Sequence, residues 1–131
     1  MNSTMSNAIS AHGQSERQSP LLEVEGLTIE VAGTRGRTLR IVEDVSFSIP
    51  RGASVALVGV SGSGKTVTSL ALMGLCKATG TKIVSGSVQF AGQELVGAPE
   101  SVWRKVRGKK AGMIFQQPRR RLNPAFTVGE Q

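Results

Sequence analysis

Apolar and polar residues alternate along three stretches of the chain, and this period of two predicts β-strands with one exposed face. The first stretch covers residues 22–31 and is interrupted near Gly26. The second covers residues 45–49 and ends at Pro50-Arg51-Gly52, and a turn is predicted before it at residues 33–36. The third covers residues 84–90. Each of these strands should pack one face on a core and leave the other in water.

Two apolar runs that do not alternate, Ser54–Val58 and Ala111–Phe115, predict parallel strands buried on both faces. Between them the period becomes helical after Lys65, with residues 67, 70, 71, 74 and 75 on one face and an end at Gly80. A shorter helix is predicted at residues 99–106, with Trp103 on its apolar side. Buried strands combined with amphipathic helices indicate an α/β fold.

A glycine-rich segment joins the first buried run to the predicted helix, and it fits G-x-x-x-x-G-K-[ST] at every fixed position. Its residues are Gly59, Val60, Ser61, Gly62, Ser63, Gly64, Lys65 and Thr66. Glycines let backbone N–H groups approach and surround an oxyanion, and the helix N-terminus adds positive charge. The pattern predicts a nucleotide-phosphate site in which Lys65 bridges phosphate oxygens and the Thr66 hydroxyl ligates magnesium. The alternative is a glycine-rich turn with a chance lysine, which the strand before it and the helix after it disfavour.

Composition excludes several other kinds of site. The 131 residues allow one domain at most, and they contain one cysteine, Cys76, and one histidine, His12. An internal disulfide, a cysteine-rich zinc site and a histidine-based metal site are therefore not expected. Asp44 is the single aspartate, which excludes an aspartate dyad. No apolar run approaches the roughly 18 residues that a membrane span needs. Residues 1–20 are polar and predicted to be a disordered tail without a secretory signal.

Residues 21–131 resemble the first half of an ABC transporter ATP-binding subunit, most closely the group that imports dipeptides and oligopeptides. The resemblance rests on four segments: 42–49, the glycine-rich loop 59–66, 85–92, and the run from Gly112-Met-Ile-Phe-Gln-Gln-Pro118 through 122–124 and 127–131. The last segment resembles the family's Q-loop. It is the most specific of the four, because many ATPases and GTPases share the glycine-rich loop but not this segment. The implied fold is an incomplete P-loop NTPase domain, with an antiparallel β part and the first half of a parallel core sheet.

The resemblance also implies cofactors, partners and a second site residue. ATP and Mg²⁺ would bind, and Gln116 would ligate magnesium and help place the attacking water. The alternative for Gln116 and Gln117 is an ordinary polar strand end. The loop after Gln116 would contact membrane-spanning permease subunits, a second ATP-binding subunit would complete the dimer, and a periplasmic solute-binding protein would act indirectly. The location implied is peripheral, at the cytoplasmic face of the inner membrane.

Several departures from the family pattern limit what this chain can do. Val31 and Ala32 stand where an adenine-stacking aromatic is usual, and Ala53 replaces a common glutamate. The signature segment, the magnesium-binding Asp with its catalytic Glu, and the switch histidine have no counterpart. Asp44 follows Glu43 after an apolar run, but the order of the acids is reversed, so a catalytic role is not favoured. We expect these 131 residues alone to bind ATP weakly, not to hydrolyse it, and to dissolve poorly.

The net charge of +7 makes an anionic partner conceivable. Basic residues gather in two places, at 104–110 and at 119–121. A nucleic-acid partner is not favoured, because aromatics are 4% of the chain and no tyrosine is present to form a stacking platform. Solvated loops and contact with a membrane subunit explain the clusters better. The alternative function from a different class is a short non-hydrolysing nucleotide- or nucleic-acid-binding module.

Overall fold

The computed structural model describes residues 19–33, 36–116 and 123–130. The strands in this part of the chain are β1 (Leu22–Ala32), β2 (Thr38–Ile49), β3 (Thr81–Phe90) and β4 (Gln93–Glu94). The α-helices are α1 (Lys65–Leu72) and α2 (Glu100–Val106), and two 3-10 helices are η2 (Lys77–Thr79) and η4 (Val128–Glu130). Most of the predicted tail and the basic run 119–121 lie outside the described residues.

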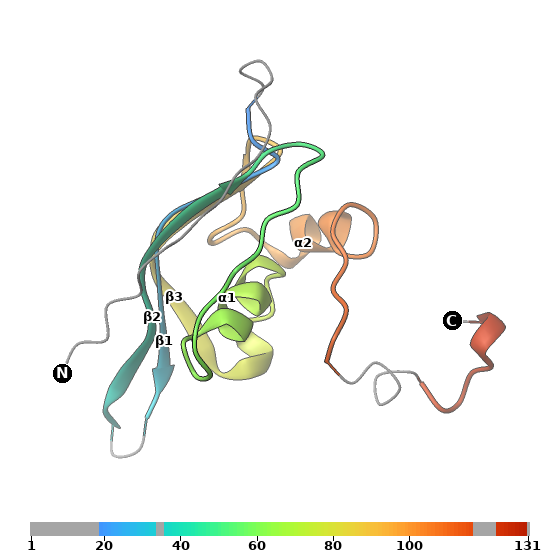
Figure 1. The fold of residues 1–131 in the computed structure, drawn as a ribbon. Coiled ribbons are helices and arrows are strands. Elements are labelled where there is room, and N and C mark those ends of the chain that lie inside the picture. Colours follow the sequence, from blue (N-terminus) through green and yellow to red (C-terminus); the bar gives the residue numbers. More distant parts are fainter. Residues whose placement is uncertain (1–18, 34–35, 117–122, 131) are drawn as a thin grey trace.

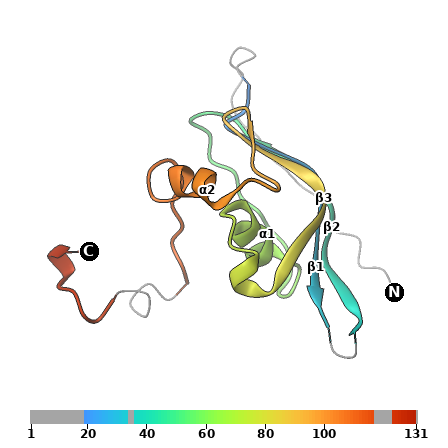
Figure 2. The same cartoon turned by 180° about the vertical axis from the view of Figure 1, so that it is seen from behind.

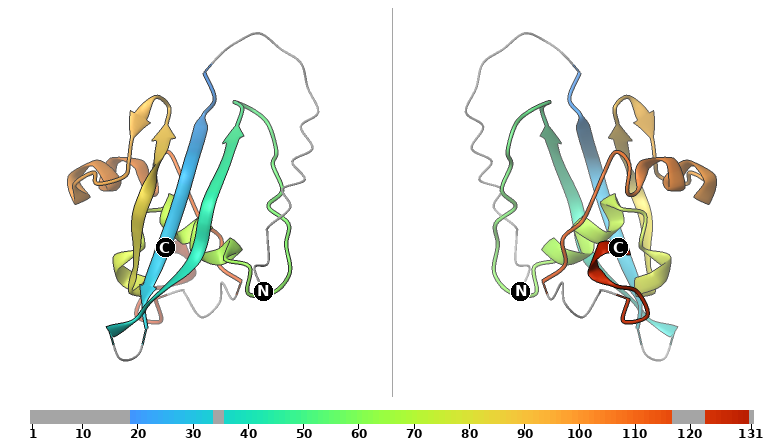
Figure 3. Two further views of the ribbon diagram at one scale, coloured as in Figure 1. Left: turned by 90° about the vertical axis from the view of Figure 1, so that its left-hand side faces the viewer. Right: turned by 90° about the vertical axis from the view of Figure 1, so that its right-hand side faces the viewer.

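The strands form one antiparallel sheet in the order β2-β1-β3-β4 (Figure 3). β1 lies between two long neighbours, so that Val24 faces Phe47 on one side and Val88 on the other. The register of β1 shifts against both neighbours between residues 24 and 28, which is the interruption predicted near Gly26. The three alternating stretches are therefore confirmed as strands, and the structure extends the second and third toward the N-terminus.

Both α-helices lie on one face of the sheet (Figures 1 and 2). The buried residues between the layers come from both the strands and the helices. They are Leu22, Val24, Leu27, Ile29, Val42, Val45, Ala71, Val88, Leu95, Trp103 and Val106. Burial of such side chains contributes about 1.5–3 kcal/mol each when the side chain is large. The alternation of the strands thus decides which sheet face receives α1.

The two helix predictions are confirmed with changed boundaries. α1 begins at Lys65 as predicted but ends at Leu72, and Gly80 instead ends η2. α2 begins at Glu100, directly after Pro99, and its Trp103 is buried as the apolar pattern predicted. The short span of α1 places the glycine-rich loop at one end of the helix and the α2 contact at the other.

The two predicted buried strands are wrong for this structure. Residues 54–58 and 112–116 have no strand pairing within the described chain, and Ala111 makes only an isolated bridge with Arg107. Val58 is 67% exposed and Ile114 is 91% exposed. A parallel strand buried on both faces needs a hydrogen-bonded neighbour and a covering layer. Neither is supplied to these runs by the described residues, so their apolar composition does not produce strands.

Candidate phosphate-binding site

The glycine-rich loop turns sharply at Gly62 and Gly64, whose φ angles are +81° and +86°. Gly64 is buried against β2, and a Cβ there would lie 2.9 Å from both the Ile41 carbonyl oxygen and Val42 Cγ2. A side chain at this position would be strained by the backbone angle and would also collide with β2. Glycine is therefore required for the loop to sit against the sheet and lead into α1.

The loop presents backbone N–H groups at the start of α1. The first helical hydrogen bond runs from the Thr68 N–H to the Gly64 carbonyl at 2.8 Å, and the Thr68 hydroxyl donates to the same oxygen at 3.0 Å. Within the described chain, no hydrogen bond uses the N–H groups of Gly62, Gly64, Lys65 or Thr66. Free N–H groups at a helix N-terminus that follow left-handed glycines form a nest for an anion.

The Lys65 side chain folds back over this loop. Its Nζ donates to the Gly59 carbonyl at 2.8 Å, the Val60 carbonyl at 2.7 Å and Ser63 Oγ at 3.2 Å. These three acceptors hold the ammonium beside the unpaired N–H groups instead of leaving it in solvent. The Lys65 ammonium and the free N–H groups therefore belong to the same eight-residue loop, a combination suited to binding an oxyanion.

Thr66 is exposed on the first turn of α1, and its hydroxyl has no partner among the described residues. An exposed hydroxyl beside an anion nest is an oxygen ligand of the kind Mg²⁺ accepts. The donor set thus fits a nucleotide phosphate chain with its metal: N–H groups and Lys65 for the phosphate oxygens, Thr66 for the cation. Val60 and Ser61 are exposed at the loop tip.

Gln116 is not brought to this loop in the structure. It is exposed at the end of the extended segment 112–116, which lies on the opposite side of α1 from the loop (Figures 1 and 2). None of the hydrogen bonds within the described residues joins it to residues 59–66. Its role as a magnesium ligand stays a prediction, and Gln117 lies outside the described residues.

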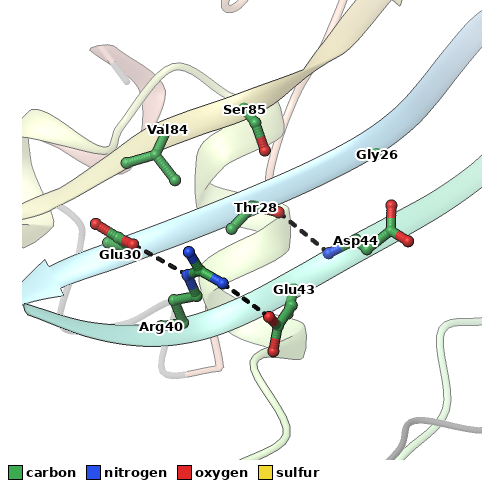
Figure 4. Close-up of a pocket in the computed structure, with 8 residues that line it drawn as sticks. All are labelled: Gly26, Thr28, Glu30, Arg40, Glu43, Asp44, Val84 and Ser85. Carbon is green, nitrogen blue, oxygen red and sulfur yellow. Dashed lines mark hydrogen bonds and ion pairs between the residues drawn. The ribbon is translucent and has the colours of Figure 1, made fainter.

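Asp44 lines a hollow of about 440 Å³ on the sheet face turned away from α1 (Figure 4). Its N–H donates to Thr28 Oγ1 at 3.1 Å, and beside it Arg40 pairs with Glu30 at 3.2 Å and with Glu43 at 2.9 Å. In the part of the chain that the structure describes, no group of acidic, histidine or cysteine side chains can hold a metal ion. That Asp44 has no catalytic role stays a prediction.

Sequence reasoning missed the residues that support the loop from outside. Ile41 and Val42 contact the loop from β2, and their apolar character gave only a strand signal.

Arg107 was grouped with solvated basic residues, and this interpretation is wrong for that residue. It is half-buried, and its guanidinium donates to the Met73 carbonyl at 3.1 Å and the Gly74 carbonyl at 3.3 Å. A basic residue in a charged run carries no local signal of such a tertiary contact.

Comparison with known proteins decides the family. The sequence model described as ABC transporter matches residues 42–131. This chain belongs to the ABC transporter family. The region that matches an ABC transporter contains the whole glycine-rich loop, α1, α2 and Gln116. The fold is therefore that of part of an α/β nucleotide-binding domain of an ABC transporter. Its antiparallel sheet is formed by β1 to β4.

Relatives of this ABC transporter chain carry names from peptide transport. It is 43% identical over 113 residues to an oligopeptide transport ATP-binding protein of Bacillus subtilis, covering 86% of this chain and 34% of the relative. It is 42% identical over 113 residues to one of Haemophilus influenzae, covering 86% and 34%. A dipeptide transport ATP-binding protein of Lactococcus lactis is 38% identical over 114 residues, covering 87% and 32%. The chain thus spans about a third of the length of the curated relatives it matches.

The structure also bears on membrane association. Among the described residues, no helix combines the length and the apolar character that crossing a membrane requires.

Proposed function

We propose that this chain belongs to the ATP-binding, energy-coupling subunit of an ABC transporter that imports peptides. The observation that carries the proposal is the loop at the start of α1, where unpaired N–H groups and the Lys65 ammonium converge. The names of relatives that share about 40% of aligned residues support the peptide class. The family membership supports transport as the process that ATP drives.

In the proposed site the chain's own groups bind and orient the nucleotide. The N–H groups of Gly62, Gly64, Lys65 and Thr66 would donate to the phosphate oxygens, and the Lys65 ammonium would add a positive charge. Thr66 and Gln116 would hold the magnesium ion. The bound Mg²⁺ neutralises charge on the phosphates. Val31 and Ala32 end β1 without an aromatic ring, so we expect weak adenine binding.

The proposed partners follow from the family and from the position of Gln116. The loop after Gln116 contacts membrane-spanning permease subunits, a second ATP-binding subunit completes the nucleotide sites, and a solute-binding protein acts indirectly. The location is peripheral, at the cytoplasmic face of the inner membrane. Exposure of the segment 112–116 supports contact of this region with another chain.

The binding proposal is tested by calorimetric titration of the 131-residue chain with MgATP. Lys65→Ala should raise the Kd at least about tenfold, because a charge-assisted contact to phosphate is removed. Lys77→Ala is the matched control: it removes an equal charge at an exposed position in η2 and should leave the Kd unchanged. Equal Kd values for wild type and Lys65→Ala would contradict the proposed site.

Hydrolysis gives a second test. The 131 residues contain one aspartate, Asp44, which lies on the sheet face turned away from α1. We therefore expect no steady phosphate release from MgATP by this chain alone. Phosphate release that Lys65→Ala abolishes would show that the chain is a complete catalyst.

Copurification of membrane-spanning subunits with the tagged chain would support the transport role. Absence of such subunits, together with ATP binding, would favour a separate binding module.

A further inference from the structure

Arg107 connects the two helices at the end of α1 that is remote from the phosphate loop. One guanidinium nitrogen, Nη1, donates to the carbonyl oxygens of Met73 and Gly74, which follow the last residue of α1. The other, Nη2, pairs with Glu100 on the first turn of α2. A cation at a helix C-terminus also interacts favourably with the helix dipole. Arg107 therefore satisfies orphan carbonyls of α1 and fixes them to α2.

Trp103 completes this contact from the inside. Its ring lies so close to Gly74 that a Cβ there would be 2.4 Å from Trp103 Cδ2. The Arg107 guanidinium lies over the same ring, 5.8 Å from its centroid, and Trp103 itself is buried. The end of α1 thus contacts both the Trp103 ring and the Arg107 guanidinium, which come from the same short segment. With both groups in place, α1 cannot shift relative to α2 without breaking several contacts together.

Arg107 lies in the turn that precedes the segment ending at Gln116. Residues 106–111 form a tight turn, in which the N–H groups of Lys110 and Ala111 donate to the Val106 carbonyl at 2.9 and 3.0 Å. The Gly108 N–H donates to the Ala111 carbonyl at 2.9 Å, and the segment 112–116 leaves from this turn. The segment 112–116 is therefore joined to Arg107 through a hydrogen-bonded turn.

We propose that Arg107 is a positioning residue for the phosphate loop, because it fixes the C-terminal end of α1 to α2 and to the turn that leads to Gln116. The proposal rests on the proposed function for its consequence in nucleotide binding. α1 has only eight residues, so a shift at Met73 moves the N–H groups at its other end. The loop that would contact a membrane subunit is then linked to the loop that would hold phosphate through one guanidinium.

The first test needs no ligand and measures amide hydrogen exchange of the full 131-residue chain. In Arg107→Gln, peptides covering residues 68–75, whose N–H groups are hydrogen-bonded in and after α1, should exchange about tenfold faster, while peptides from β1 and β3 should not change. Arg107→Lys should restore part of the protection, since it keeps the charge but lacks the fork that reaches two carbonyls and Glu100. Arg104→Gln is the matched control, because it removes the same charge from an exposed position on α2.

Two results would overturn the proposal. One is unchanged exchange over residues 68–75 in Arg107→Gln, and the other is an equal increase in every peptide, which indicates a general loss of stability. The second test titrates MgATP: Arg107→Gln should raise the Kd at unchanged stoichiometry, whereas loss of folded protein would lower the stoichiometry instead. If wild type binds no MgATP, the proposed function fails, and the exchange experiment still decides the role of Arg107.

Discussion

A single carboxylate organises the end of the sheet where β3 turns into β4. Glu94 Oε1 accepts hydrogen bonds from the N–H groups of Val88, Leu95 and Val96 at 3.0, 2.9 and 2.8 Å, and Oε2 accepts from the Ser87 hydroxyl. Partial burial by itself raises the pKa of this carboxyl, but the hydrogen bonds from Ser87, Val96, Val88 and Leu95 outweigh it and lower the pKa. The ionised form is therefore the one that the fold prefers.

The lowered pKa predicts how stability depends on pH. Glu94 contributes fully above its unfolded pKa of about 4.3, and its contribution is lost as the pH falls through the lower folded value. Glu94→Gln should reduce the free energy of unfolding by about 1 kcal/mol at pH 7, a figure that allows for solvent exposure. Denaturant titrations at pH 7 and pH 3 should show a smaller difference between wild type and variant at the lower pH. Glu25→Gln, at an exposed position on β1, is the control; an equal effect of both changes would contradict the role of Glu94.

Among the elements, β1 and β3 are distorted together where they cross over α1. Gly86 has a φ of +98°, and a Cβ there would lie 2.6 Å from Leu27 Cα and 2.7 Å from the Glu25 carbonyl oxygen. The register of β1 against β3 shifts between Glu25 and Thr28, opposite this glycine. The close approach of two backbones is what lets the strands bend, and it depends on a residue without a side chain.

Gly86→Ala should destabilise the fold by about 3 kcal/mol or more, because backbone strain and backbone collision act together. Gly92→Ala separates the two causes: its φ is +78°, but no atom lies within 4 Å of the added Cβ. We expect that control to cost about 1 kcal/mol through strain alone. Denaturant titration measures both variants, and equal losses would show that the approach of Leu27 does not matter.

At the level of the whole molecule, the apolar runs 54–58 and 111–115 expose apolar side chains on segments that pair with no strand. Both are extended, and Val58 and Ile114 are largely exposed. Extended apolar segments with unpaired backbone groups are templates for pairing with other chains. They are therefore the part of this molecule that we expect another polypeptide to cover.

The chain should consequently self-associate, and the combined change of Val58→Thr and Ile114→Lys should shift it toward the monomer. Size-exclusion chromatography with light scattering measures the mass at several concentrations. Leu39→Thr is a control outside both runs, because Leu39 is also exposed but belongs to the paired strand β2. A monomeric wild type would contradict the prediction, as would a Leu39→Thr variant that dissociates equally well.

Local sequence patterns were enough to predict the three long strands, both α-helices and the position of the glycine-rich loop. These features are encoded locally, in a period of two, a period near 3.6, and glycines whose backbone angles few other residues adopt. Three features emerged only from the folded chain: the two uninterrupted apolar runs are not strands, Arg107 is hydrogen-bonded to the end of α1, and Gln116 is not hydrogen-bonded to the loop. The physical reason is that strand pairing, burial of a charge and convergence of site residues depend on groups distant along the chain, which a local pattern does not contain.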